Sequence, residues 1–195
     1  NNKIAHVDYL DYVSSDKNKR EGFIKEFGDS LNNMGFAIVA NHGVSDDEKQ
    51  ALYQVSEEFF KLDDATKNKY HSTELAGQRG YIPKNIETAK GRSVADLKEF
   101  YHVGQELTDA ENKEMGYPPN IFPEEAPTLK DISLKIFDTF ENTGRNLLKA
   151  IASYLNLEEE YFNDKIHHGN SVLRMLHYFP LDSIEGIPEG AVRAG

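Results

Sequence analysis

The feature that most restricts the fold of this chain is a long stretch, residues 71–127, in which neither a helical nor a strand period persists. Glycines and prolines interrupt it, and only residues 80–83 and 98–103 have the β-branched and aromatic composition of strands. The regular alternation of strands and helices that a doubly wound sheet requires is therefore missing. A long irregular stretch inside a compact domain more often serves a binding site than a linker.

The segments on either side of this stretch have clear periods. Residues 4–9 and 36–40 predict short strands, whereas residues 16–34 and 128–155 carry apolar side chains at helical spacing. Gly35 follows the last apolar residue of the first of these helices, where a glycine commonly ends a helix. These elements, with the irregular stretch between them, predict a mixed α+β fold.

The last periodic segment, residues 171–178, predicts a strand that Pro180 terminates. Because successive side chains of a strand point to opposite faces, Ser171, Leu173, Met175 and His177 share an ordinary core-facing side. The opposite face carries a guanidinium and a phenol among apolar groups. This face consists of Val172, Arg174, Leu176 and Tyr178. If it points inward it lines a pocket, and if it points outward it is merely hydrated.

Composition excludes several classes of function. The chain of 195 residues has 33 acidic and 22 basic residues and a formal charge of -11, which argues against nucleic acid or an anionic membrane as a partner. It contains no cysteine, so disulfides, thiolate nucleophiles and cysteine-ligated metals are excluded. No apolar run has the length of a membrane span, and the first residues do not form a signal peptide, so we expect a cytoplasmic protein.

Histidines do not identify a complete active site. His6 and Asp8 form an H-x-D pair, which can supply two ligands of an iron site, but a short strand beside the chain terminus is a poor place for a preorganised site. His42 lies in a predicted turn, where we expect its ring to form a hydrogen bond with the backbone rather than to bind a metal. The adjacent His167 and His168 should diverge on extended backbone. Nucleophile motifs and the helical zinc-hydrolase pattern are also absent.

Several segments, in their order, resemble the isopenicillin N synthase-like family of iron(II)/2-oxoglutarate-dependent oxygenases. The resemblance spans nearly the whole chain and includes the Gly-Phe strand that ends in Asn-His-Gly and residues 147–162, which are similar to the family's long helix. The segments that carry it are Ile4-Ala-His-Val-Asp8, Met34-Gly-Phe-Ala-Ile-Val-Ala-Asn-His-Gly-Val44, Arg79-Gly-Tyr-Ile-Pro83, Asp96-Leu-Lys-Glu-Phe100 and Leu173-Arg-Met-Leu-His-Tyr178. In this resemblance the His6-x-Asp8 pair is accidental.

The resemblance implies a helical N-terminal region followed by the first strands of a double-stranded β-helix (jelly roll) whose sheet is incomplete in this chain. Residues 1–127 would form the N-terminal oxygenase region, with mixed helices and strands, and residues 128–195 the long helix and the start of the jelly-roll core, as one continuous unit. It also implies Fe(II) and 2-oxoglutarate as cofactors. The family's iron ligands, H-x-D and a distant His, and its Arg-x-Ser motif are not in this sequence. Residues 192–195 are similar to the segment that precedes H-x-D, so we expect the N-terminal part of a longer polypeptide.

By resemblance, the intact protein oxidises a small-molecule substrate with dioxygen, by hydroxylation, desaturation or ring closure. Tyr178 would contact the cosubstrate or the substrate, Arg174 would line the same pocket, and Arg79 would bind a substrate carboxylate, since a guanidinium suits that anion. Leu176 stands where the family often has Asn, which removes a polar contact near the cosubstrate. The alternative is a non-catalytic fragment or binding module that lacks the iron site. The oligomeric state stays open.

Overall fold

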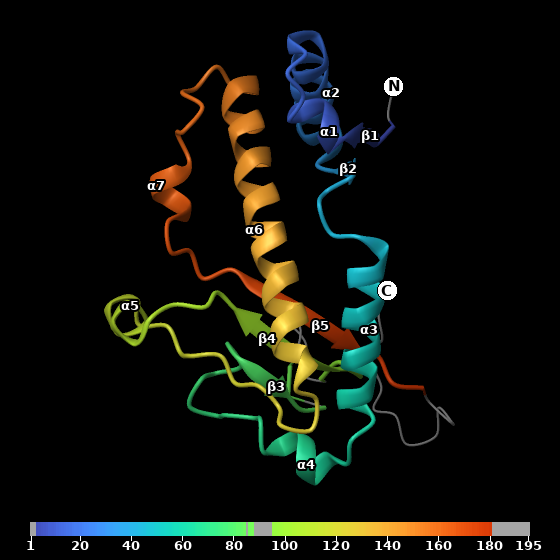
Figure 1. Ribbon diagram of the computed structural model, residues 1–195, viewed down its shortest axis with the longest axis vertical. Helices are drawn as coiled ribbons and strands as arrows, with labels where there is room; N and C mark the ends of the chain where they lie inside the picture. The colour runs from blue at the N-terminus through green and yellow to red at the C-terminus, as the bar shows by residue number, and fades with distance from the viewer. Residues whose placement is uncertain (1–2, 85, 88–94, 181–195) are drawn as a thin grey trace. The chain divides into compact units, whose positions relative to one another are not determined.

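The computed structural model describes residues 3–84, 86–87 and 95–180 (Figure 1). The chain divides into two compact units: Asn1–Asp46 with Asp138–Gly169, and Asp47–Phe137 with Asn170–Gly195. The match predicted at residues 192–195 lies outside the described residues, and the predicted division after residue 127 stays a prediction. None of the helices in the described part of the chain has the length and apolarity that crossing a bilayer requires.

The first unit is built on a parallel pair of short strands, β1 (Ala5–Asp8) and β2 (Ala37–Ala40). The chain between them forms α1 (Tyr9–Tyr12) and the long α2 (Lys17–Met34). Gly35 ends α2 as predicted: it has a left-handed backbone with φ of 75°, and its N–H donates to the carbonyl of Leu31. The second half of α6 (Thr128–Tyr154) and α7 (Asn163–Ile166) complete this unit.

The core of the first unit is aromatic. Tyr12, Phe23 and Phe27 are buried with Val7 and Ala150, so α1, α2, β1 and α6 each contribute to it. The rings of Tyr12 and Phe23 lie 5.4 Å apart and those of Phe23 and Phe27 5.5 Å apart, which is ordinary aromatic packing. The apolar period predicted for residues 16–34 is therefore confirmed as the buried face of α2.

The second unit contains an antiparallel sheet with the strand order β3-β4-β5, whose strands lie side by side in Figure 1. Its strands are β3 (Gly80–Ile82), β4 (Glu99–Gly104) and β5 (Val172–His177), which confirms the three strands predicted for this part of the chain. Two helices, α3 (Asp46–Phe60) and α4 (Asp64–Asn68), precede the sheet. A further helix, α5 (Asp109–Met115), lies where only irregular structure was predicted.

The strand register divides the sheet into two faces. Tyr101 of β4 lies opposite Tyr81 of β3 and Met175 of β5, and all three are buried in a core with Phe59 of α3 and Leu129 of α6. The alternate residues occupy the other face, where His102 lies opposite Arg174 and Phe100 lies opposite Ile82 and Leu176. The predicted alternation of β5 is thus confirmed: Leu173 and Met175 pack on the core, whereas Val172, Arg174 and Leu176 are exposed.

Candidate functional site

A cavity lies on the face of the second unit's sheet that carries Arg174. Its volume is about 390 Å³. The strands supply its polar and aromatic wall, and the irregular stretch that follows α4 supplies the remainder. The lining residues are Ile82, Phe100, His102 and Arg174, with His71, Ser72, Thr73, Ala76, Gly77, Ile86 and Glu87 from the loops. Apolar walls with a few converging polar groups are typical of a small-molecule site.

Arg174 is the cationic group of this cavity, and three neighbours contact its guanidinium. Nε donates to Nε2 of His102 at 2.6 Å. The guanidinium carbon lies 4.5 Å from the centre of the Phe100 ring, a cation–π contact. Nη1 faces the carboxylate of Glu87 at 3.3 Å and 3.5 Å. Of the two alternatives for this strand face, a pocket lining and a merely hydrated surface, the geometry at Arg174 favours the pocket lining.

His102 supports this arginine from the neighbouring strand. Its side chain is buried, and Nδ1 lies 2.6 Å from the carbonyl oxygen of Gly77. Because a carbonyl only accepts, Nδ1 must carry the proton and Nε2 must offer its lone pair to Arg174. Burial lowers the pKa of His102 below its ordinary value, in agreement with a neutral ring.

Sequence reasoning missed His102 and Glu87 as members of the site. The alternation of residues 98–103 places His102 and Phe100 on one face of a strand, and that signal is present in the sequence. What brings His102 opposite Arg174 is the pairing of β4 with β5, which comes from distant parts of the chain. Glu87 reaches the cavity from a loop and has no periodic signal at all.

Arg79, predicted to bind a substrate carboxylate, is only 1% exposed and is not among the residues that line the cavity. Nη1 donates to the carbonyl of Gln78 and Nη2 to Oδ1 of Asn170. Burial lowers its pKa, and its Nε has no hydrogen-bond partner among the described residues. The contact with Asn170 joins the segment before β3 to the segment before β5. A ligand-binding role for Arg79 stays a prediction.

Tyr178, predicted to contact the cosubstrate or substrate, follows directly after the last residue of β5. It is half-buried and does not line the cavity. The structure therefore brings Arg174, but neither Tyr178 nor Arg79, into this cavity. The predicted role of Tyr178 stays a prediction.

A buried polar network lies on the core face of the same sheet. The Glu99 carboxylate, 1% exposed, accepts hydrogen bonds from Nζ of Lys67 at 2.7 Å and the hydroxyl of Tyr81 at 2.5 Å, and pairs with Nδ1 of His177 at 2.8 Å. Burial alone would raise the pKa of Glu99, but the bonds from Lys67, Tyr81 and His177 outweigh it and hold that pKa below the ordinary value. The network ties α4, β3, β4 and β5 together.

No group of three or more His, Asp or Glu side chains that could hold a metal ion exists among the described residues. Asp8 instead caps α1, since its carboxylate accepts from the N–H of Leu10 at 2.9 Å and from the amide of Asn41 at 2.9 Å. That the His6-x-Asp8 pair is accidental stays a prediction. The iron ligands implied by the resemblance are not found in the described part of this chain.

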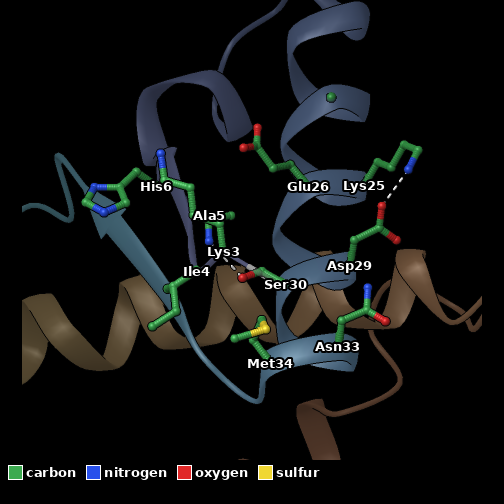
Figure 2. Close-up of a pocket in the computed structure, with 11 residues that line it drawn as sticks. Lys3, Ile4, Ala5, His6, Lys25, Glu26, Asp29, Ser30, Asn33 and Met34 are labelled. Atoms are coloured by element: carbon green, nitrogen blue, oxygen red, sulfur yellow. Dashed lines mark hydrogen bonds and ion pairs between the residues drawn. The ribbon is translucent and has the colours of Figure 1, made fainter. Parts of the chain in front are cut away.

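A larger hollow, about 730 Å³, lies between β1 and α2 in the first unit (Figure 2). Two of its charged side chains already pair with each other: Nζ of Lys25 lies 2.5 Å from the Asp29 carboxylate, as the dashed line in Figure 2 shows. The buried hydroxyl of Ser30 accepts from the N–H of Ala5 and donates to the carbonyl of Phe36. These groups are committed to the fold, so the smaller cavity of the second unit is the better candidate site.

Comparison with known proteins agrees with this architecture. The model of the family described as "non-haem dioxygenase in morphine synthesis N-terminal" matches residues 5–125. A 2-oxoglutarate-Fe(II) type oxidoreductase, ppzD, of Metarhizium rileyi is 25% identical over 190 residues, which is 90% of this chain and 52% of that protein. Validamycin A dioxygenase of Streptomyces hygroscopicus is 25% identical and is covered to 54%.

Solved structures show the same fold. A protein of Caulobacter crescentus assigned to the 2OG-Fe(II) oxygenase family superposes with a TM-score of 0.80 and 33% identity, over 94% of this chain and 58% of that one. A full-length protein of Neurospora crassa, solved in complex with alpha-KG, gives a TM-score of 0.80 at 24% identity, over 98% of this chain and 59% of that one.

The chain belongs to the non-haem dioxygenase family whose N-terminal region the matching model describes. It spans about half the length of the curated relatives it matches, with 52% and 55% of the first two covered. The predicted fold class is confirmed: mixed helices and strands with an incomplete sheet, as in the N-terminal half of the jelly-roll 2OG-Fe(II) oxygenases.

Proposed function

We propose that the protein containing this chain is an Fe(II)/2-oxoglutarate-dependent dioxygenase that oxidises a small-molecule substrate. One observation carries the proposal: the relatives that match 90% of this chain are named 2-oxoglutarate-Fe(II) oxidoreductases. The family match over residues 5–125 supports it independently. Hydroxylation, desaturation and ring closure all remain within the proposal.

The described residues do not fit an iron site, because they contain no metal-binding group of His, Asp and Glu. Iron with 2-oxoglutarate would supply the oxidising chemistry, and its ligands would have to come from outside the described residues. What this chain contributes is one wall of a cavity: apolar side chains that exclude water, and Arg174 as a fixed cation. Tyr178 and Arg79 are the further side chains that we propose for cosubstrate or substrate contact.

The proposed partners are a small-molecule substrate and dioxygen. The formal charge of -11 supports the view that nucleic acid and anionic membranes are not partners, because a phosphate-rich surface would be repelled. A cytoplasmic location is part of the same proposal and rests on composition alone.

A second candidate function is a binding module of the same fold without catalysis. The absence of a metal-binding group from the described residues is the observation that favours it. The two functions differ in one measurable respect, which is whether the intact protein consumes 2-oxoglutarate.

The test is succinate formation by the purified intact protein with Fe(II), 2-oxoglutarate and dioxygen. We expect succinate even without a substrate, at a slow uncoupled rate, and none after chelation of the iron. A protein that forms no succinate, with or without candidate substrates, and binds no Fe(II) would be the non-catalytic module instead.

A further inference from the structure

The guanidinium of Arg174 is held by two contacts from β4 that do not involve its terminal nitrogens. Nε is bound to Nε2 of His102 at 2.6 Å, and the flat face lies over the Phe100 ring at 4.5 Å. Both partners come from β4 and are buried, so they are rigid supports. A guanidinium held by its Nε and its face can still present Nη1 and Nη2 together, which is the pair that binds a carboxylate in bidentate fashion.

His102 can perform this function in one protonation state only. Its Nδ1–H donates to the carbonyl of Gly77, so its Nε2 is a pure acceptor for Arg174. A doubly protonated ring would present an N–H to the N–H of Arg174 and would add a second positive charge. The neutral ring thus orients the guanidinium without competing for an anion.

Glu87 is a weak partner for the terminal nitrogen that it contacts. Its oxygens lie 3.3 Å and 3.5 Å from Nη1, at the long limit of a hydrogen bond, and the two side chains are 35% and 39% exposed. Glu87 also has a closer cation, Nζ of Lys98 at 2.8 Å. If Arg174 released it, Glu87 would remain paired.

We propose that Arg174 is the anchor for a ligand carboxylate in this cavity, that His102 positions it, and that Glu87 holds the place which the ligand takes. The ligand is a small carboxylic acid whose apolar part lies against Phe100, Ile82 and Ile86 in a volume of about 390 Å³. This inference rests on the proposed function, since that function brings two possible carboxylates to the site: one on the substrate and those of 2-oxoglutarate.

Binding measurements on the intact protein under anaerobic conditions distinguish the two sources. Calorimetry with benzoate represents an acid substrate, benzamide is its uncharged control, and 2-oxoglutarate with Fe(II) represents the cosubstrate. We expect benzoate to bind more tightly than benzamide, and Arg174→Gln to weaken benzoate about tenfold while benzamide is unchanged. A loss confined to 2-oxoglutarate would assign the anchor to the cosubstrate carboxylate. If Arg174→Gln changes the affinity of neither acid, the anchor is overturned.

Two substitutions separate the contacts of His102. His102→Gln keeps an acceptor oxygen near the position of Nε2, whereas His102→Asn keeps a donor near Nδ1 but loses the contact to Arg174. We expect benzoate affinity to fall several-fold in His102→Asn and to be largely retained in His102→Gln, with benzamide affinity equal in both. Equal losses for benzoate and benzamide in both variants would mean that His102 only maintains the fold, and would overturn its positioning role.

Glu87→Gln tests the displacement. Without the competing charge, benzoate should bind a few-fold more tightly, whereas Glu114→Gln, an exposed change on α5, should leave it unaltered. Weaker benzoate binding by Glu87→Gln would show that Glu87 does not hold the ligand's place. These experiments measure binding and not turnover, so they are independent of the succinate test. Absence of succinate would count against the dioxygenase proposal without affecting the Arg174 anchor. Unchanged acid binding by Arg174→Gln would overturn the anchor without affecting the dioxygenase proposal.

Discussion

Glu99 shows how much of the second unit depends on a single side chain. Its carboxylate is the common acceptor for Lys67 and Tyr81, and both of those side chains are at most 2% exposed. Breaking a buried pair costs more than the pair contributes, because the remaining charge stays buried. The network does not line the cavity, but it stabilises the sheet on which the cavity is built.

We expect Glu99→Gln to lower the free energy of unfolding by roughly 3 kcal/mol, the low end for a broken buried ion pair. Asp64, 3.1 Å from Nζ of Lys67, is largely exposed and compensates only in part. Urea unfolding of the variant gives the value. Glu57→Gln removes the exposed pair with Lys61 and should change nothing measurable; equal effects of the two substitutions would contradict the network's role.

His102 makes stability depend on pH in a predictable direction. Burial lowers its pKa in the folded protein, so the unfolded chain takes up the proton first as the pH falls. Because the unfolded state then binds more protons than the folded state, the free energy of unfolding decreases as the pH falls below the ordinary histidine pKa. The groups that face the ring with a charge are Arg174, Glu87 and Arg79.

Between about pH 7 and pH 5, the wild-type protein should lose more unfolding free energy than His102→Gln, which cannot take up this proton. The comparison requires urea unfolding of both proteins at both pH values. Glu99 affects stability at lower pH than His102. Because its pKa is depressed in the folded protein, Glu99 stabilises the fold at pH values above the ordinary carboxyl range, and this contribution is lost as the pH falls through the pKa of Glu99 in the folded protein. Parallel losses in the two proteins would show that His102 is not responsible.

At the scale of elements, α2 offers a direct test of packing in the first unit. A Cβ atom on Gly28 would lie 2.2 Å from the Tyr154 ring, so this glycine permits the close approach of α2 and α6. On Gly22, in the same helix, a Cβ would meet no described atom within 4 Å. The two positions differ in packing but not in helical context.

Gly28→Ala should destabilise the protein by about 1–3 kcal/mol, because the Tyr154 ring would have to move. Gly22→Ala should stabilise it by roughly 0.5–1 kcal/mol, through the better helix propensity of alanine. Thermal unfolding of both variants gives the two signs. A stabilising Gly28→Ala would mean that the Tyr154 ring yields without cost.

The elements also show what the sequence could and could not predict. The strands 80–83, 98–103 and 171–178 have local signals, and β5 alternates as predicted. Helix α5 was missed because it buries none of its side chains and so has no apolar period, although the reciprocal capping of Thr108 and Glu111 marks its start. The partners of Arg174 were missed because β4 and β5 pair in the sheet although they are far apart in the sequence, with all of α6 between them.

At the scale of the whole molecule, the chain covers about half of its relatives, 52% in the first of them. The described residues provide a cavity wall and a cation but no metal-binding group. We therefore expect residues 1–195 by themselves to form no succinate and to show no Fe(II) binding in a calorimetric titration. For the intact protein we expect both succinate formation and Fe(II) binding. Stoichiometric iron binding by the fragment alone would place ligands within these residues.

Strand β4 sends alternate residues to two destinations: Glu99, Tyr101 and Val103 to the core face, and Phe100 and His102 to the cavity. A protein engineer can therefore vary Phe100 and His102 to change ligand choice and leave the odd-numbered positions and Gly104 untouched. Point substitutions respect that separation. A single inserted or deleted residue in β4 would exchange the two faces of the strand. The carboxylate of Glu99 would then face the cavity, and the imidazole of His102 would face the core.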